Sequence, residues 1–378
     1  MIPTLLGGMT AKEFLRDYWQ KKPLLIRGAV PGFGDWLDRD RTIAMACCED
    51  GEARLIANAG GDWEVRRGPF LAKDLKRRKD LWTVLVQGVN LTLPEGDALL
   101  REFDFIPHAR LDDLMVSYAV DGAGVGPHFD SYDVFLLQGM GRRHWHISAQ
   151  KDQRLRDDVP LKILSHFKSE QDWVLEPGDM LYLPPQYAHD GVAVGECMTW
   201  SIGFRAAPRQ ELAENFLGYL QERISTSGRY ADPDLKLQKH PAEIGKAMID
   251  QVDAMLAEIK WDRSIVRDFL GTYLTEPKPH VYFEPPASPL PLSRFVSRLR
   301  KHGARLDPRT QLLFSGNRFY INGEECDVDR RDQQQLRELA DRRQLRGQLI
   351  NASPGLSEDG LVLLHAWYCD GFLHLVES

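Results

Sequence analysis

Short runs of strand-forming residues, separated by glycine and proline turns, fill the stretch between residues 113 and 204. The runs cover residues 114–120, 128–138, 143–148, 173–175, 180–183 and 198–204. Turn sequences such as Gly139-Met-Gly141 and Glu176-Pro-Gly-Asp179 lie between them. Many short strands at this spacing are typical of a β-sandwich or a β-barrel. The central part of the chain is therefore predicted to form such a core.

Helical patterns flank this β-rich stretch on both sides. A capping-box pattern at Thr10 and Glu13 predicts a short helix near the start, and a strand is expected over 24–26. Beyond Pro208, apolar residues recur at helical spacing over 212–224, 244–259 and 265–270. These stripes either pack inside one subunit or form a dimer interface, and their spacing does not separate the two interpretations.

The last hundred residues have a different pattern. A proline-rich stretch, 277–291, is predicted to be a linker. A helix (292–302), a hairpin (312–321) and a second helix (331–342) follow it, which fits a winged-helix-like domain. We therefore expect an α+β protein of three parts: a β-rich core at 1–208, a helical region at 209–276 and a winged-helix-like domain at 277–378.

Composition excludes several classes of protein. No apolar run approaches the roughly 20 residues of a membrane-spanning helix, and the first residues do not resemble a signal peptide, so a cytoplasmic protein is expected. The five cysteines form no Cys-x-x-Cys pair, which argues against a disulfide scaffold or a thiolate zinc site. The formal net charge of −7 argues against broad nucleic-acid binding.

The tripeptide His128-Phe129-Asp130 is the most informative pattern for chemistry. On a strand, alternation directs the imidazole of His128 and the carboxylate of Asp130 to the same face. His189 follows an apolar strand and two prolines, where the chain is expected to return across the core. Two histidines and one carboxylate on one face of a metal are the ligand set of non-haem Fe(II) oxygenases. His128, Asp130 and His189 are therefore predicted to hold iron.

A cation is predicted on the same interior. In oxygenases of this kind that use 2-oxoglutarate, the distal carboxylate of that cosubstrate lies buried and requires a paired cation. Alternation in Arg142-Arg143-His144-Trp145-His146 directs Arg143 and Trp145 to the apolar face, and His144 and His146 away from it. Arg143 is thus the candidate cation. The hydroxyls of three further residues are expected to complete the carboxylate's surroundings: Ser117, Thr199 and Ser201.

Four segments together identify a family resemblance: Tyr18–Arg27, Gly124–Phe135, Gln138–Trp145 and Glu176–His189. They resemble the JmjC cupin oxygenases and, within these, the bacterial ribosomal oxygenases, over essentially the whole chain. The resemblance implies a double-stranded β-helix core, a helical dimerisation region that makes a homodimer, and a winged helix that does not bind DNA. It also implies 3-hydroxylation of an arginine in ribosomal protein sixteen of the large subunit. Arg143 matches the bacterial branch, because related animal enzymes carry lysine there.

The residues that bind the substrate are less clearly marked. Tyr132 is expected on the face of His128 and Asp130, and Asp133 and Asp190 are candidates for holding a guanidinium group. Two other functions stay open from the residues alone. One is a JmjC oxygenase acting on histidine or lysine of another basic protein, and the other is a non-catalytic cupin that serves as a binding module.

Overall fold

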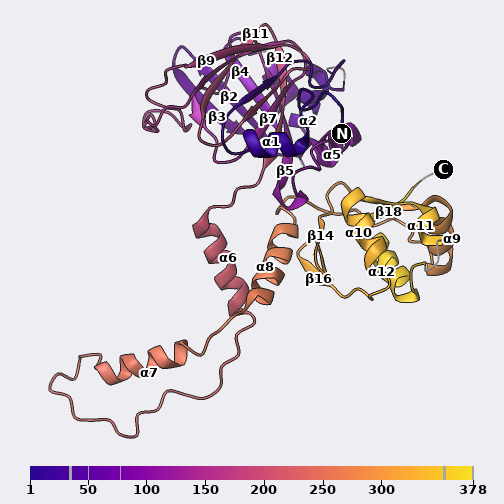
Figure 1. Cartoon of the computed structure of the whole chain (residues 1–378). Coiled ribbons are helices and arrows are strands. Elements are labelled where there is room, and N and C mark those ends of the chain that lie inside the picture. The colour runs from indigo at the N-terminus through magenta and orange to yellow at the C-terminus, as the bar shows by residue number, and fades with distance from the viewer. Residues whose placement is uncertain (34–35, 50, 77, 352–354, 377–378) are drawn as a thin grey trace. The chain divides into compact units, whose positions relative to one another are not determined.

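The computed structural model describes residues 1–33, 36–49, 51–76, 78–351 and 355–376 (Figure 1). The chain divides into two compact units, Met1–Ala206 and Ala207–Ser378. All five cysteines are free, as the sequence predicted. Among the described residues, no helix combines the length and the apolar character needed to cross a lipid bilayer.

The first unit is built on two antiparallel β-sheets (Figure 1). The larger has the strand order β1-β10-β7-β12-β5-β4-β2-β3, and the smaller has the order β6-β11-β8-β9. The strands are β1 (Leu24–Ile26), β2 (Ala53–Ala59), β3 (Asp62–Arg67), β4 (Leu81–Val86), β5 (Leu111–Ala119), β6 (His128–Phe129), β7 (Val134–Gln138), β8 (Arg142–Ser148), β9 (Gln171–Leu175), β10 (Met180–Leu183), β11 (Ala188–Val194) and β12 (Cys197–Phe204).

From β5 to β12 the chain passes repeatedly between the two sheets. Strands β5, β7, β10 and β12 join the larger sheet, whereas β6, β8, β9 and β11 make the smaller one. This is the arrangement expected of a double-stranded β-helix. Its consequence is that residues far apart in the sequence face one another across a common interior.

The two faces of the larger sheet have different partners. Alternate residues of β5, Leu114, Val116 and Tyr118, lie in the main hydrophobic core with Phe14 and Phe103. Three helices contribute to that core: α1 (Ala11–Asp17), α2 (Arg39–Ala46) and α5 (Pro94–Arg101). The shorter helices of this unit are α3 (Ala72–Lys76), α4 (Val89–Thr92) and a 3-10 turn (His108–Arg110). Met115 and Ser117, which alternate with these residues along β5, face the smaller sheet because side chains alternate along a strand.

The predicted capping box at the start of α1 is confirmed. The Thr10 hydroxyl accepts a hydrogen bond from the backbone N–H of Glu13 at 3.2 Å, and the Glu13 carboxylate accepts one from the backbone N–H of Thr10 at 2.8 Å. Together they satisfy two backbone donors that have no partner inside the helix. The helix then places Phe14, which is fully buried, against the larger sheet.

The second unit combines helices with two small sheets. Its helices are α6 (Arg209–Gln221), α7 (Lys246–Leu256), α8 (Arg263–Thr275), α9 (Leu292–His302), α10 (Gln333–Arg342), α11 (Gly347–Asn351) and α12 (Glu358–Cys369). Strands β14 (Leu312–Ser315), β15 (Arg318–Ile321) and β16 (Glu324–Cys326) form one sheet, and β13 (Ala304–Leu306), β17 (Gln344–Leu345) and β18 (Leu373–Leu375) form the other. Helices α9, α10 and α12 share a buried core with these strands, which fits the predicted winged helix.

Helix α8 packs against the β14–β16 sheet. A Cβ atom on Gly271 would lie 2.4 Å from ring atoms of Tyr320, so the helix and the hairpin touch at the glycine. The Tyr320 hydroxyl also donates a hydrogen bond of 2.5 Å to Asp268. The last part of the predicted helical region is therefore held against the C-terminal hairpin.

Two details of the predicted core differ from the structure. The run 128–138 forms two strands, because Asp130 to Asp133 lies between β6 and β7. Aspartate and serine side chains compete with strand hydrogen bonds, which favours a bend there. Strand β11 was not predicted, since its Asp190 and Gly191 weaken the strand pattern.

Candidate metal centre

Strands β6 and β11 bring the two predicted histidine ligands together. The strands pair antiparallel, with His128 directly opposite His189, and the ring centroids lie 4.3 Å apart. Asp130 follows β6 at once. Its Oδ1 lies 3.7 Å from Nε2 of His128, and its Oδ2 lies 3.5 Å from Nε2 of His189. One ligand atom from each of the three residues therefore lies within 4.8 Å of the other two.

Hydrogen bonds orient both imidazole rings. Nδ1 of His128 lies 2.8 Å from the carbonyl oxygen of Gly126, and Nδ1 of His189 lies 3.3 Å from that of Tyr187. A carbonyl only accepts, so each Nδ1 carries a proton and each Nε2 is the nitrogen left for a metal ion. Burial lowers the pKa of His189 to about 4, so its ring is neutral at neutral pH. Both rings are thus prepared to ligate a cation through Nε2.

The donor set fits a divalent iron ion. Neighbouring ligand atoms of an octahedral ion with bonds of about 2.1 Å lie roughly 3 Å apart, and the distances of 3.5 and 3.7 Å need only small side-chain shifts to reach this value. Two imidazoles and one carboxylate on one side leave the other positions open for further ligands. His189 is almost fully buried, whereas His128 and Asp130 keep about a quarter of their side-chain surface exposed. The open positions therefore have a route to solvent.

Arg143 is a buried cation with unsatisfied donors. It lies on β8, is 4% exposed, and donates one hydrogen bond of 3.4 Å from Nη1 to the hydroxyl of Ser117. Its Nε and Nη2 have no hydrogen-bond partner among the described residues. A buried charge without partners is costly, and a bidentate anion is the partner that the guanidinium fork matches. The site therefore fits the distal carboxylate of a dicarboxylic acid.

The three predicted hydroxyl residues all lie buried on the interior face. Ser117 on β5 pairs directly with Thr199 on β12, and Ser201 lies two residues further along β12. Only Ser117 of the three has an observed hydrogen bond with Arg143. The Thr199 hydroxyl donates to Oε1 of Gln138 at 3.2 Å. Ser117 is therefore the best placed of the three beside the cation.

Trp145 lies next to His189, one of the predicted metal ligands. Its ring centroid lies 5.8 Å from that of His189, and its partner across the strands is Gly191. A Cβ atom on Gly191 would lie 2.6 Å from the Trp145 ring, so only glycine leaves room for the indole. This packing holds the indole ring next to His189.

Tyr132 is the first of the three residues that the sequence predicted to bind the substrate. Tyr132 lies beside the centre, and its pKa is raised first by burial and then by the charges of Asp130 and Asp113. The sequence predicted Tyr132 on a strand, but in the structure it lies in the bend between β6 and β7.

The placement of Asp133 and Asp190 contradicts the role predicted for them. Asp133 is fully buried and accepts hydrogen bonds from Tyr182 at 2.7 Å and from Gln20 at 2.8 Å. Its carboxylate is therefore already hydrogen-bonded to side chains of its own unit. Asp190 pairs with His146 and alternates with His189 on β11, which directs it to the other face of the sheet. Neither carboxylate faces the metal ligands.

Asp113 was missed by the sequence analysis and lies next to Tyr132. A Cβ atom on Gly203 would lie 3.7 Å from Oδ1 of Asp113 and 3.9 Å from the Tyr132 ring, so the two side chains flank the same glycine. The other carboxylate oxygen of Asp113 accepts a hydrogen bond of 3.2 Å from Gly88. Alternation along β5 puts Asp113 on the face of Ser117, and this signal was available in the sequence.

Comparisons with known proteins agree with this arrangement. Residues 98–212 match the JmjC domain, and residues 258–374 match the ROXA-like winged helix. The chain is 33% identical to the ribosomal protein uL16 3-hydroxylase of Escherichia coli (strain K12), over 84% of this chain and 86% of that protein.

Solved structures extend the likeness to the whole fold. The crystal structure of E. coli ycfD has a TM-score of 0.85 and 30% identity, covering 97% of this chain and 98% of that one. A structure of YcfD, a ribosomal oxygenase, in complex with cobalt and 2-oxoglutarate has a TM-score of 0.81 over the same shares. This confirms the predicted fold class, a double-stranded β-helix core with a winged helix. The chain therefore belongs to the ribosomal oxygenases, the family in which a JmjC domain is followed by a ROXA-like winged helix.

Proposed function

We propose that this protein is an Fe(II)- and 2-oxoglutarate-dependent oxygenase that hydroxylates an arginine side chain of ribosomal protein uL16 at its 3-position. The observation that carries the proposal is the combination of a His128-Asp130-His189 cluster with a buried Arg143, whose Nε and Nη2 have no hydrogen-bond partner in the part of the chain that the structure describes. The cluster suits iron, and the arginine suits the far carboxylate of the cosubstrate. The substrate is inferred from the E. coli relative, which is a ribosomal protein uL16 3-hydroxylase.

Iron together with 2-oxoglutarate supplies the oxidising chemistry, by which oxygen and the cosubstrate become succinate, carbon dioxide and one hydroxyl group on the substrate. The residues of the chain provide position and environment. His128, Asp130 and His189 would hold iron through two Nε2 atoms and a carboxylate. Arg143 and Ser117 would bind the carboxylate of the cosubstrate at its far end, and Trp145 packs next to His189.

Asp113 and Tyr132 are the proposed contacts for the guanidinium group of the substrate. The Asp113 carboxylate offers a charge-assisted hydrogen bond, and the aromatic face of Tyr132 suits a planar cation. Both side chains flank Gly203, which places them beside one another. An arginine held there would extend its aliphatic carbons toward Asp130 and the metal.

The variant Asp113→Asn tests this contact. It keeps the side-chain shape and removes the charge, so we expect the KM for an arginine peptide to rise at least about tenfold, as expected for the loss of a charge-assisted hydrogen bond worth about 1.5 kcal/mol. The KM for 2-oxoglutarate should stay the same. Steady-state kinetics with both substrates varied would measure the two values, with Asp112→Asn as the neighbouring control. Equal effects of both variants would contradict the assignment.

The proposed target residue is tested with matched peptides. A uL16 peptide that carries the target arginine, and the same peptide with lysine or histidine there, are incubated with enzyme, Fe(II), 2-oxoglutarate and oxygen. Succinate formation with arginine alone supports an arginine hydroxylase. Turnover with lysine or histidine instead would favour the alternative JmjC activities, and no turnover with any peptide would favour a binding module.

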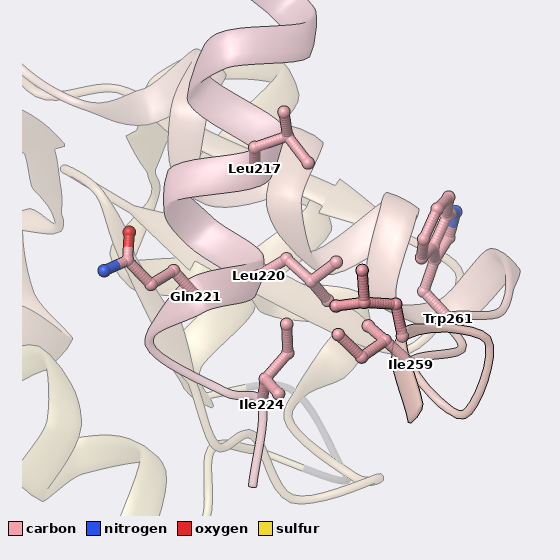
Figure 2. A pocket seen from close by; sticks show the side chains of 7 residues that line it. Leu217, Leu220, Gln221, Ile224, Ile259 and Trp261 are labelled. Carbon is pink, nitrogen blue, oxygen red and sulfur yellow. The ribbon is translucent and has the colours of Figure 1, made fainter. Parts of the chain in front are cut away.

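We also propose that the chain forms a homodimer through the helical region 209–276, between a catalytic part at 1–208 and a winged helix at 277–378. Apolar side chains of α6, of the end of α7 and of the segments that follow these two helices line a groove of about 400 Å³: Leu217, Leu220, Ile224, Leu256, Ile259 and Trp261. Figure 2 shows Leu220 of α6 on the side of the helix that faces Ile259 and Trp261. Along α7, Met248, Ile249, Val252 and Leu256 are exposed, and such a patch indicates a protein interface.

A negative charge introduced into this groove by substitution is expected to dissociate the dimer into monomers. Leu217 is 59% exposed, so Leu217→Glu leaves the fold of one chain intact and puts a carboxylate where apolar burial is needed. Analytical ultracentrifugation should show dimeric wild type and a monomeric variant. Leu155→Glu, at another exposed leucine in the first unit, is the control and should stay dimeric. A wild-type protein that sediments as a monomer would contradict the proposal.

The cytoplasm is the proposed location of the protein. A ribosomal protein as substrate places the enzyme where ribosomes are assembled. The five free cysteines fit a reducing compartment.

A further inference from the structure

A second cluster of metal-binding side chains lies on the outer face of the smaller sheet. It consists of His144 and His146 on β8 and Asp172 on β9. Side chains alternate along β8, so these two histidines point away from the interior that holds Arg143 and Trp145. The cluster is therefore separate from the His128-Asp130-His189 centre. Its side chains are reached from solvent, with 36%, 27% and 51% of their surfaces exposed for His144, His146 and Asp172.

The strand pairing sets the positions of the three side chains. His146 pairs directly with Asp172, and His144 lies two residues away on the same face of β8. The two imidazole centroids are 4.0 Å apart. Nδ1 of His146 is hydrogen-bonded to Oδ1 of Asp172, and Nε2 of His144 lies 3.8 Å from the same oxygen. Two paired strands thus place three ligands together without a flexible loop.

The charge state of the cluster also suits a cation. The pKa of Asp172 is lowered by hydrogen bonds from His146 and Ser169, so the side chain is a carboxylate at neutral pH. Coordination through Nδ1 of His146 requires only that its proton move to Nε2 of the same ring.

We propose that His144, His146 and Asp172 form a second metal site, which binds the divalent transition ion Zn²⁺. Two imidazoles and one carboxylate are a common zinc donor set, and a water molecule can fill the fourth position. Ligand atoms around a tetrahedral zinc ion lie roughly 3.3 Å apart, given bonds of about 2.0 Å. The 3.8 Å between His144 and Asp172 is close to this value, and the hydrogen bond of His146 opens to admit the ion. The site favours zinc over iron because imidazole sites bind Zn²⁺ more tightly than Fe²⁺.

The test is the number of zinc ions that the untagged full-length protein binds at neutral pH, measured by isothermal titration calorimetry. Wild type is expected to bind two ions per chain, one at each cluster. Asp172→Asn removes the charged ligand but keeps a hydrogen-bond acceptor for His146, so we expect the strand pair to persist and one ion to be lost. His144→Ala should also lose one ion, with affinity at the outer site falling at least about tenfold.

Controls separate the two clusters. His128→Ala should lose the interior ion and keep the outer one, and the double variant His128→Ala/Asp172→Asn should bind none. His166→Ala removes another exposed histidine and should still bind two. Activity of Asp172→Asn with Fe(II) shows that this variant is folded. The proposal is wrong if wild type binds a single ion that His128→Ala abolishes, or if Asp172→Asn binds as many ions as wild type.

Discussion

Replacement of His189 by alanine is expected to lower turnover of 2-oxoglutarate by more than a hundredfold. The loss of a group that only hydrogen-bonds to a metal ligand typically reduces metal affinity or activity by about 10–100-fold, and His189 is itself a proposed ligand. Its Nε2 is the atom that meets Asp130, and its ring lies directly opposite His128. The variant should therefore lose both the tight binding of iron and the reaction that iron supports.

The measurement combines metal content with succinate formation under saturating cosubstrate. His108→Ala, which removes a histidine paired with Asp104 at the surface of the same unit, is the matched control and should keep full activity. Circular dichroism shows whether the buried site tolerates the smaller side chain. If the alanine variant folds and still turns over at a tenth of the wild-type rate or more, His189 is not a ligand.

The second large effect is expected at Arg143. Truncation of one partner of a buried, hydrogen-bonded charge pair costs about 2–5 kcal/mol, which corresponds to at least about thirtyfold in binding. Arg143→Ala should therefore raise the KM for 2-oxoglutarate by that factor or more. Arg143→Lys keeps the charge but loses the two-pronged fork, so its KM should lie between those of wild type and alanine.

Arg142→Ala provides the control, because Arg142 is the exposed neighbour of Arg143 on β8 and points to the other face. It should leave the KM for 2-oxoglutarate unchanged. Thermal unfolding without added cosubstrate gives a second readout. Since Nε and Nη2 of Arg143 have no hydrogen-bond partner among the described residues of the protein, Arg143→Met should be at least as stable to heat as wild type. A KM for 2-oxoglutarate that is unaltered in Arg143→Ala would rule out the proposed role.

Local patterns in the sequence predicted much of the candidate site. His128 and Asp130 were assigned to one face from spacing alone, and Arg143 was assigned to the interior by alternation with Trp145. Both inferences depend on the period of two in a strand, which is a local property. The pairing of His128 with His189 depends instead on β11, whose Asp190 and Gly191 obscure its strand character. The direct pairing of His128 with His189 could therefore be seen only in the folded structure.

The substrate residues show where local reasoning fails. Asp133 looked available because it lies three residues from Asp130, yet Tyr182, Gln20 and Arg110 surround its carboxylate. These partners come from distant segments, and no local pattern indicates them. Asp190 was assigned by proximity to His189, although neighbours on a strand face opposite sides. Asp113 lies just before the predicted strand 114–120, but β5 begins at Leu111, and the approach of Asp113 to Tyr132 results from packing near Gly203.

The central claim is that this chain adds oxygen to an arginine of uL16 with the metal held by His128, Asp130 and His189. The most direct measurement is tandem mass spectrometry of uL16 after incubation with enzyme, Fe(II), 2-oxoglutarate and oxygen, with His189→Ala run in parallel. We predict a gain of one oxygen atom, localised to the β-carbon of a single arginine, that is absent with the variant. Unmodified uL16, or oxygen on another residue type, would contradict this account.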